Sequence, residues 1–129
     1  MKRILVVEDD NSLSVLLRLI MKVQQEDWDV NTAATGVEAL SQVETFQPDL
    51  ILLDIMMPEM DGLEVARRLR NDARYKDQKI VILSALSDPE TQRKAKEAGA
   101  LEYWTKPISP DDLRDGMLRV LGTETADLL

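Results

Sequence analysis

The sequence predicts a single α/β domain in which helices cover both faces of a five-stranded parallel sheet. Three observations lead to this prediction. Short apolar runs alternate along the chain with segments whose apolar residues recur at helical spacing. Three of the runs are continuously hydrophobic, as expected for parallel strands that are buried on both faces. The chain has 129 residues, enough for one core that buries roughly two-thirds of the unfolded surface.

Five apolar runs are predicted to form the strands. They span residues 4–7, 30–34, 50–53, 80–83 and 101–104. The first, third and fourth contain only apolar residues, so both faces of these strands should be covered. The second alternates more and contains Asn31 and Thr32, which indicates a strand at the edge of the sheet.

The segments between the runs are predicted to form five helices, because their apolar residues recur three or four positions apart. In chain order these residues are Leu13, Leu16, Leu17 and Ile20; Val37, Leu40 and Val43; Leu63, Ala66 and Leu69; Ala95 and Ala98; and Leu113, Met117, Val120 and Leu121. The fourth helix has only the two alanines as clear apolar anchors. A helix that buries so little should lie in a shallow energy well and move easily.

Residues at the expected helix ends support these boundaries. Asp10 or Asn11 can cap the first helix, Asp88-Pro89 starts the fourth, Ser109-Pro110 starts the fifth, and Gly99 lies where the fourth should end. The resulting (βα)₅ pattern predicts right-handed crossovers. One domain is expected at residues 1–122, with a short tail at residues 123–129.

Composition narrows the classes of function. The net charge is −8 and the isoelectric point about 4.5, which argues against binding to nucleic acid or to an anionic membrane. The chain contains neither cysteine nor histidine, so a metal site would depend on oxygen ligands and favour Mg²⁺ or Ca²⁺. No apolar stretch resembles a signal peptide or a membrane span. A cytoplasmic location is therefore expected.

Reactive groups gather at the carboxyl ends of the predicted strands, where a sheet of this class binds its ligand. The first strand runs into the acidic triplet at residues 8–10, and the third into Asp54 within the segment "LLDIMMPEMDG". The fourth ends in Ser84-Ala85, and the fifth leads to Lys106-Pro107. Adjacent carboxylates repel one another, so either water or a cation must neutralise this cluster.

These four motifs, in this order and each after its own strand, resemble those of a response-regulator receiver domain, the phosphoacceptor module of two-component signalling. The resemblance covers essentially the whole chain. It implies a doubly wound sheet of strand order 2-1-3-4-5, with the site between the first and third strands. It also implies that Asp54 accepts a phosphoryl group from a kinase histidine, and that Lys106 neutralises charge during the transfer.

The same resemblance implies a Mg²⁺ site, in which Mn²⁺ is expected to substitute. Its direct ligands would be Asp9, Asp54 and the backbone carbonyl of Met56, with Glu8 acting directly or through water. Asp10 is expected to be a cap or a solvated flank.

For switching, the family pattern implies that Ser84 hydrogen-bonds the phosphoryl group and that Tyr103 then turns inward. The protein-interaction surface around the fourth helix, fifth strand and fifth helix would thereby change. The Lys106-Pro107 bond is expected to be cis. Ser84 takes the place of a more frequent threonine and keeps the hydroxyl. Met56 and Leu86, with Ile55, place apolar bulk around the expected phosphoryl group, which predicts slow self-dephosphorylation.

Two other classes of function are less compatible with the residues. An aspartyl phosphohydrolase would need a second acid two residues after its nucleophile, where this chain has Met56. A nucleotide- or flavin-binding module would need a phosphate-cradling loop after the first strand, where three carboxylates stand. The resemblance implies a self-phosphorylating and self-dephosphorylating switch, not a turnover enzyme.

The expected partners are a sensor histidine kinase or a histidine phosphotransfer protein, and a downstream protein target. No basic recognition helix follows the fifth helix, so a stand-alone regulator is favoured. The receiver part of a transcription factor or hybrid kinase, with its output domain missing, is the alternative. A phosphorylation-dependent homodimer is left open.

Overall fold

Within the residues that the structure describes, five parallel strands form one sheet in the order β2-β1-β3-β4-β5, which confirms the predicted fold and strand order. The structure, a computed structural model, describes residues 1–24 and 27–122. The predicted tail at residues 123–129 lies outside the described residues. The strands are β1 (Lys2–Val7), β2 (Trp28–Ala33), β3 (Leu50–Leu53), β4 (Lys79–Ser84) and β5 (Glu102–Thr105).

Strand boundaries differ from the predictions by one or two residues at every strand except β3. The second strand begins two residues earlier than predicted, because Trp28 pairs with Lys2 in the ladder between β1 and β2. The fifth begins one residue later than predicted. Leu101 is still 54% exposed, and its N–H reaches the carbonyl of Ile80 from the turn before the strand. The strand pairing therefore corrects the strand boundaries that hydrophobicity alone predicted.

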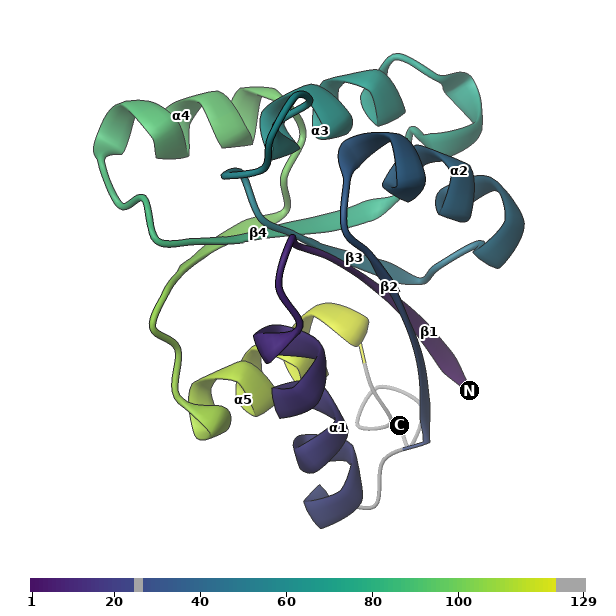
Figure 1. The fold of residues 1–129 in the computed structure, drawn as a ribbon, viewed down its shortest axis with the longest axis vertical. Helices are drawn as coiled ribbons and strands as arrows, with labels where there is room; N and C mark the ends of the chain where they lie inside the picture. Colours follow the sequence, from purple (N-terminus) through teal and green to yellow (C-terminus); the bar gives the residue numbers. More distant parts are fainter. Residues whose placement is uncertain (25–26, 123–129) are drawn as a thin grey trace.

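In the described part of the chain, four α-helices and one short 3₁₀ turn connect the strands, and a fifth α-helix follows β5. They are α1 (Ser12–Gln24), α2 (Gly36–Phe46), α3 (Gly62–Arg70), η1 (Ala73–Tyr75), α4 (Pro89–Glu97) and α5 (Pro110–Leu121). As Figure 1 shows, α1 and α5 lie on one face of the sheet and α2, α3 and α4 on the other. This two-sided cover explains why the central strands are continuously apolar. No helix in the described part of the chain is long and apolar enough to cross a membrane.

Side chains at the helix starts confirm part of the predicted capping. Asp88 accepts a hydrogen bond from the backbone N–H of Thr91 at the start of α4, and Ser109 caps α5. For α1 both candidates contribute. Asp10 accepts from the backbone N–H of Ser12 at 2.8 Å, while Asn11 supplies the carbonyl of the first helical hydrogen bond.

The α4 helix is attached to the core only weakly, as predicted. Among its residues only Ala95 is buried, and Ala98 is buried just beyond its end. The backbone then turns at Gly99, whose φ of 97° is left-handed, where a side chain is disfavoured. A small apolar footprint is consistent with a helix that can shift at little cost.

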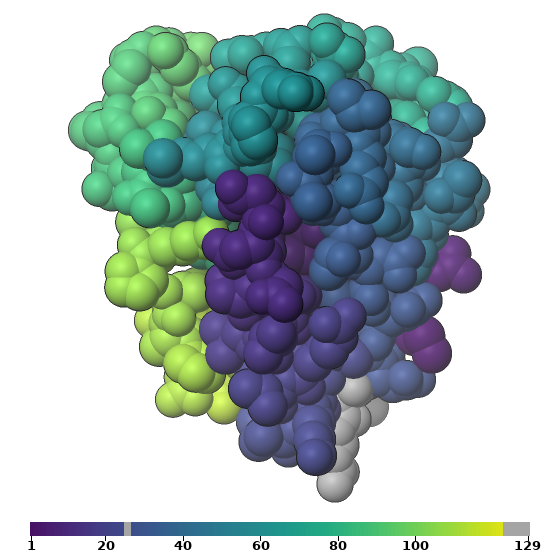
Figure 2. Space-filling view, viewed as in Figure 1, coloured from purple at the N-terminus to yellow at the C-terminus, as the bar shows by residue number. Residues whose placement is uncertain are grey.

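Strand register determines where the site forms. Val7 is paired with Leu53, and Leu53 with Ile82, so the loops after β1, β3 and β4 leave the sheet side by side. In Figure 2 the start of α1 (dark purple), which follows β1, lies at the surface between the segments of α5 (yellow-green) and α2 (blue). The segment that follows β1, at the end of the sheet that carries the predicted site residues, therefore reaches the surface.

Candidate functional site

Asp54 lies at the centre of the site, one residue beyond the end of β3. Its backbone N–H donates to the carbonyl of Val7 at 2.9 Å, so the sheet holds its Cα in place. Its side chain is 11% exposed, accessible yet largely enclosed. One carboxylate oxygen, Oδ1, accepts a hydrogen bond from the backbone N–H of Met56 at 3.1 Å. The carboxylate is thus oriented while remaining reachable from solvent.

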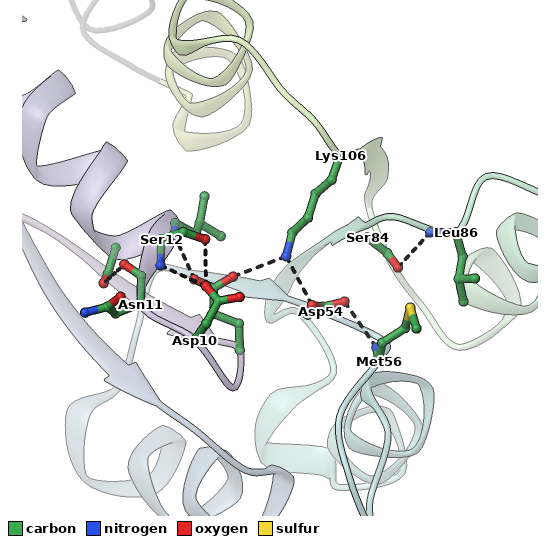
Figure 3. A network of polar contacts seen from close by, with 11 residues as sticks. Asp10, Asn11, Ser12, Asp54, Met56, Ser84, Leu86 and Lys106 are labelled. Atoms are coloured by element: carbon green, nitrogen blue, oxygen red, sulfur yellow. Dashed lines mark hydrogen bonds and ion pairs between the residues drawn. The ribbon is translucent and has the colours of Figure 1, made fainter.

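Lys106 reaches across the end of the sheet to this carboxylate (Figure 3). Its Nζ lies 3.1 Å from Asp54 Oδ2 and 3.3 Å from Glu8 Oε2. Burial by itself disfavours the ammonium, but the hydrogen bonds and charges of Asp54 and Glu8 outweigh it, and the pKa of Lys106 lies above its ordinary value. The ammonium is therefore charged and directed at the predicted acceptor.

Glu8 is the most buried acid of the predicted site, with 4% of the residue exposed. Its Oε1 accepts the backbone N–H of Leu13 at 2.8 Å, and its Oε2 pairs with Lys106. Burial raises the pKa of Glu8, although the Leu13 N–H and the Lys106 charge both favour the ionised form. The residue thus links the first turn of α1 to the loop after β5.

The other two acids of the triplet are exposed. Asp10 is engaged by the backbone N–H and the hydroxyl of Ser12, and these hydrogen bonds lower its pKa. Asp9 lies beside the site, and its side chain accepts no hydrogen bond among the described contacts. Within residues 1–24 and 27–122, no three acidic side chains are gathered closely enough to hold a metal ion.

The chemistry of the donor groups nevertheless fits a hard cation. Asp9, Asp54 and the backbone of Met56 offer oxygen donors on two neighbouring loops, and the chain has no histidine or cysteine that would favour a softer metal. These are the residues that would hold Mg²⁺.

Ser84 is fully buried at the end of β4. Its Oγ accepts a hydrogen bond from the backbone N–H of Leu86 at 3.2 Å, and Figure 3 shows this contact on the same side of the sheet as Asp54 and Met56. The loop after β4 is therefore tied to the hydroxyl that was predicted to sense the phosphoryl group.

Tyr103, the predicted reporter, is half-buried in β5. Its hydroxyl donates to the carbonyl of Leu86 at 2.6 Å, and burial raises the pKa of the phenol. The backbone of Leu86 thus contacts both predicted switch residues. Its N–H contacts Ser84, and its carbonyl contacts Tyr103. Sequence patterns could not reveal this link, because backbone atoms carry no residue-specific signal.

Gly62 is a further residue whose importance only the structure reveals. A Cβ at this position would lie 2.2 Å from the backbone carbonyl oxygen of Asp54, so only glycine fits. Its N–H donates to the carbonyl of Ile55 at 3.0 Å, and Asp61 caps the helix that begins there. The sequence signal was the "MDG" segment, which suggests a turn but not this close approach.

The loop after β5 contains the cis peptide bond Lys106-Pro107, as predicted. An open apolar groove of about 390 Å³ lies next to Lys106, between the start of α1 and this loop. Leu13, Leu83 and Ile108 contribute its apolar lining. The site is therefore bordered by a surface on which a larger molecule could rest.

Comparison with known proteins agrees with this arrangement. Regulators that resemble the chain include PhoP of Bacillus subtilis (strain 168), an alkaline phosphatase synthesis transcriptional regulatory protein, with 38% identity over 120 residues. MtrA of Mycobacterium tuberculosis (strain H37Rv), a DNA-binding response regulator, is 39% identical over 112 residues. These alignments cover 93% and 87% of this chain but 48% and 47% of the relatives. The chain therefore spans about half the length of the curated relatives it matches.

Solved structures match over nearly their whole length. The chemotaxis response regulator CheY4 of Vibrio cholerae has a TM-score of 0.82 at 32% identity, covering 93% of this chain and 98% of that chain. A CheY-like receiver domain protein of Methanospirillum hungatei JF-1 has a TM-score of 0.83 at 29% identity, covering 95% and 94%. The family model of the response regulator receiver domain matches residues 4–117. With this match and the relatives above, the chain belongs to the receiver domains of two-component response regulators.

Proposed function

We propose that Asp54 is the phosphoacceptor of this receiver domain and that its phosphorylation switches a protein-interaction surface. The observation that carries this proposal is the arrangement at Asp54. The carboxylate projects from a strand end, is oriented by the Met56 N–H, and lies 3.1 Å from the Lys106 ammonium. A carboxylate that is fixed, accessible and adjacent to a cation is suited to act as a nucleophile.

The reaction would proceed by attack of an Asp54 carboxylate oxygen on the phosphorus of a phosphohistidine. The phosphorus–nitrogen bond breaks, the imidazole leaves with the electron pair, and an acyl phosphate remains on Asp54. Lys106 would neutralise charge on the phosphoryl oxygens, since phosphoryl transfer depends mainly on positioning and electrostatics. When bound, Mg²⁺ would supply further neutralisation of these oxygens. We assign its ligands to Asp9, Asp54 and the Met56 carbonyl.

The proposed phosphodonor is a sensor histidine kinase or a histidine phosphotransfer protein. A protein donor must bring its imidazole to a carboxylate that is only 11% exposed in its side chain, so it needs a surface beside the site. The apolar groove next to Lys106 offers such a surface. Because one phosphoryl group is held on the protein itself, we class the chain as a signalling switch and not as a turnover enzyme.

The proposed output is a change at the surface formed by α4, β5 and α5. Ser84 would follow the phosphoryl group, and the Leu86 backbone would carry this movement toward Tyr103. This change would act on a protein target or an output domain. Among the relatives, PhoP is named a transcriptional regulatory protein and MtrA a DNA-binding response regulator. The weakly anchored α4 supports this route, because its buried footprint is small.

The test is the intact mass of the protein after incubation with a small phosphodonor and Mg²⁺. Unaltered protein should gain one phosphoryl group, while Asp54→Asn should gain none. Asp77→Asn is a matched control, because Asp77 is exposed in the loop before β4, at the opposite end of the sheet. It should be phosphorylated like the unaltered protein. A gain by Asp54→Asn equal to that of the unaltered protein would refute the proposal.

A further inference from the structure

The two ends of α4 lie in different surroundings. The helix follows β4, so it begins at the end of the sheet that carries Asp54 and ends at the opposite end, where β5 begins. Residues 87–90 at its start are exposed, whereas Ala95 and Ala98 near its far end are buried. The helix is therefore packed against the core at its C-terminal end only.

The hydrogen bonds at the start of α4 do not tie it to other elements. Asp88 accepts from the backbone N–H and the hydroxyl of Thr91, at 2.9 Å and 2.8 Å. The side-chain amide of Gln92 donates to the carbonyl of Ser87 at 2.9 Å. Among the described residues, every side-chain hydrogen bond of residues 87–97 stays within this segment. These bonds can therefore move together with the helix.

The far end of α4 is held by a residue of a neighbouring helix. Arg70, the last residue of α3, donates to the carbonyl of Gly99 at 2.7 Å, just beyond α4. The same guanidinium donates to the carbonyls of Tyr75 at 2.8 Å and Gln78 at 2.6 Å. Hydrogen bonds from a charged donor are stronger than neutral ones. Arg70 thus joins the end of α4 to η1 and to the turn before β4.

Gly99 is shaped to receive this contact. Its φ of 97° is left-handed, and a Cβ at this position would lie 2.3 Å from Arg70 Nε. The backbone N–H of Gly99 donates to the carbonyl of Lys96, and that of Ala100 to the carbonyl of Ala95, which closes the helix end. The guanidinium therefore contacts a helix end of defined geometry.

Space is open beside the rest of the helix. A groove of about 520 Å³ lies between α4 and β5. Pro89 and Gln92 line it from α4, and Leu101 and Tyr103 line it from β5. The first turns of α4 can therefore change their distance from β5 without displacing a packed core.

We propose that Arg70 anchors the C-terminal end of α4, so that the helix swings about this end and moves mainly at its N-terminal end. The free end is the one on the side of the sheet that carries Asp54, where a phosphoryl group would act. Arg70 is thus a positioning residue, which touches no reacting group and determines which end of α4 moves. The link to phosphorylation rests on the proposed function, whereas the anchor itself does not.

The experiment measures distances between two spin labels by pulsed electron paramagnetic resonance. The chain has no cysteine, so each label is attached to an introduced one. The first stays at Arg18→Cys on α1, and the second is placed at Glu90→Cys or at Lys96→Cys, all exposed positions. The distance distribution to position 90 should be at least about twice as wide as that to position 96, because an end with few tertiary contacts samples more positions.

The variant Arg70→Gln is then added to both label pairs. It should widen the distribution to position 96 at least about twofold, because the anchored end loses its charged donor. Arg68→Gln is the control, since it lies on the same helix and removes only an exposed pair with Glu64. It should change neither distribution. A merely structural role of Arg70 would lower stability without widening the distances, which are recorded in molecules that circular dichroism shows to be folded.

A small phosphodonor and Mg²⁺ should shift the mean distance to position 90 by about 1–2 Å or more, and that to position 96 by less than about half as much. Equal shifts at the two positions would overturn the swing. Equal widths at positions 90 and 96 with Arg70 in place would overturn the anchor, and this comparison needs no folded Arg70 variant.

Failure of the proposed function is distinguishable from failure of this inference. In that case the intact mass would show no phosphoryl group on the unaltered protein. The widths in the unphosphorylated protein would still decide whether Arg70 holds one end of α4 while the other end moves.

Discussion

The hydroxyl of Tyr103 donates a hydrogen bond of 2.6 Å to the backbone carbonyl of Leu86. This contact joins β5 to the loop after β4. In that loop, the backbone N–H of Leu86 donates a hydrogen bond to the Ser84 hydroxyl. The Tyr103 contact fixes the aromatic ring in a half-buried position against the loop. The inward position of Tyr103 is therefore stabilised by one definable interaction, which can be removed without changing the ring.

The variant Tyr103→Phe removes that hydrogen bond and keeps the aromatic ring. The free energy of unfolding should fall by about 0.5–1.5 kcal/mol, the usual net value of one such bond. Urea denaturation monitored by circular dichroism measures this change. Tyr75→Phe is the control, since no hydrogen bond from the Tyr75 hydroxyl occurs among the described residues. An equal loss in both variants would show that the Leu86 contact adds no stability.

Self-dephosphorylation should be slow because Met56 and Leu86, which flank the acceptor, offer no group that would orient an attacking water. Met56 is 54% exposed beside Asp54. The double variant Met56→Asn with Leu86→Glu introduces polar groups there, and decay of the acyl phosphate should accelerate at least about tenfold. The decay is followed by intact mass after removal of the phosphodonor.

The control for this prediction is Val37→Asn, which makes the same kind of change at another exposed apolar residue. It should leave the lifetime of the acyl phosphate unaltered. If the double variant decayed at the rate of the unaltered protein, apolar surroundings could not be the cause of a slow reaction.

Arg70 connects three segments at the end of the sheet opposite the site. Its guanidinium donates to the carbonyls of Tyr75, Gln78 and Gly99 at 2.6–2.8 Å. Arg70→Gln leaves these partly buried acceptors without a charged donor, and stability should fall by about 2–3 kcal/mol. Arg68→Gln, which removes only an exposed pair with Glu64, should cost about 0.5 kcal/mol or less. Equal losses in urea denaturation would contradict this role.

The charge of Lys106 makes a pH-dependent contribution to stability. Its pKa is raised in the folded protein above the ordinary value for lysine, which is about 10.4. The folded state therefore retains the proton where the unfolded state releases it. The stabilisation is complete below about pH 10 and is lost as the pH rises through the folded pKa.

Urea denaturation between about pH 9 and 11.5 tests this sign. The free energy of unfolding should decrease with rising pH more steeply in the unaltered protein than in Lys106→Gln. The exposed Lys96 provides the control, and Lys96→Gln should keep the steeper slope. Parallel pH profiles for the unaltered protein and Lys106→Gln would show that Lys106 gains no proton affinity on folding.

The sequence by itself determined the order and type of the elements. Continuous apolar runs such as residues 50–53 required strands that are covered on both faces, and capping residues such as Asp88 and Ser109 marked helix starts. These features follow from interactions between near neighbours, so they can be read from spacing along the chain. Placing Asp54 and Lys106 after their strands also brought them to one edge of the sheet, because parallel strands end at the same side.

Only the tertiary structure decided how the site residues divide their contacts. Glu8 and Lys106 are 98 positions apart in sequence, and their pairing depends on strand register, side-chain direction and the length of each side chain. The acceptors of Arg70 and Tyr103 are backbone carbonyls, which every residue has and which no motif distinguishes. A hydrogen bond requires atoms to meet within a few tenths of an ångström, and that precision arises only when the elements are packed together.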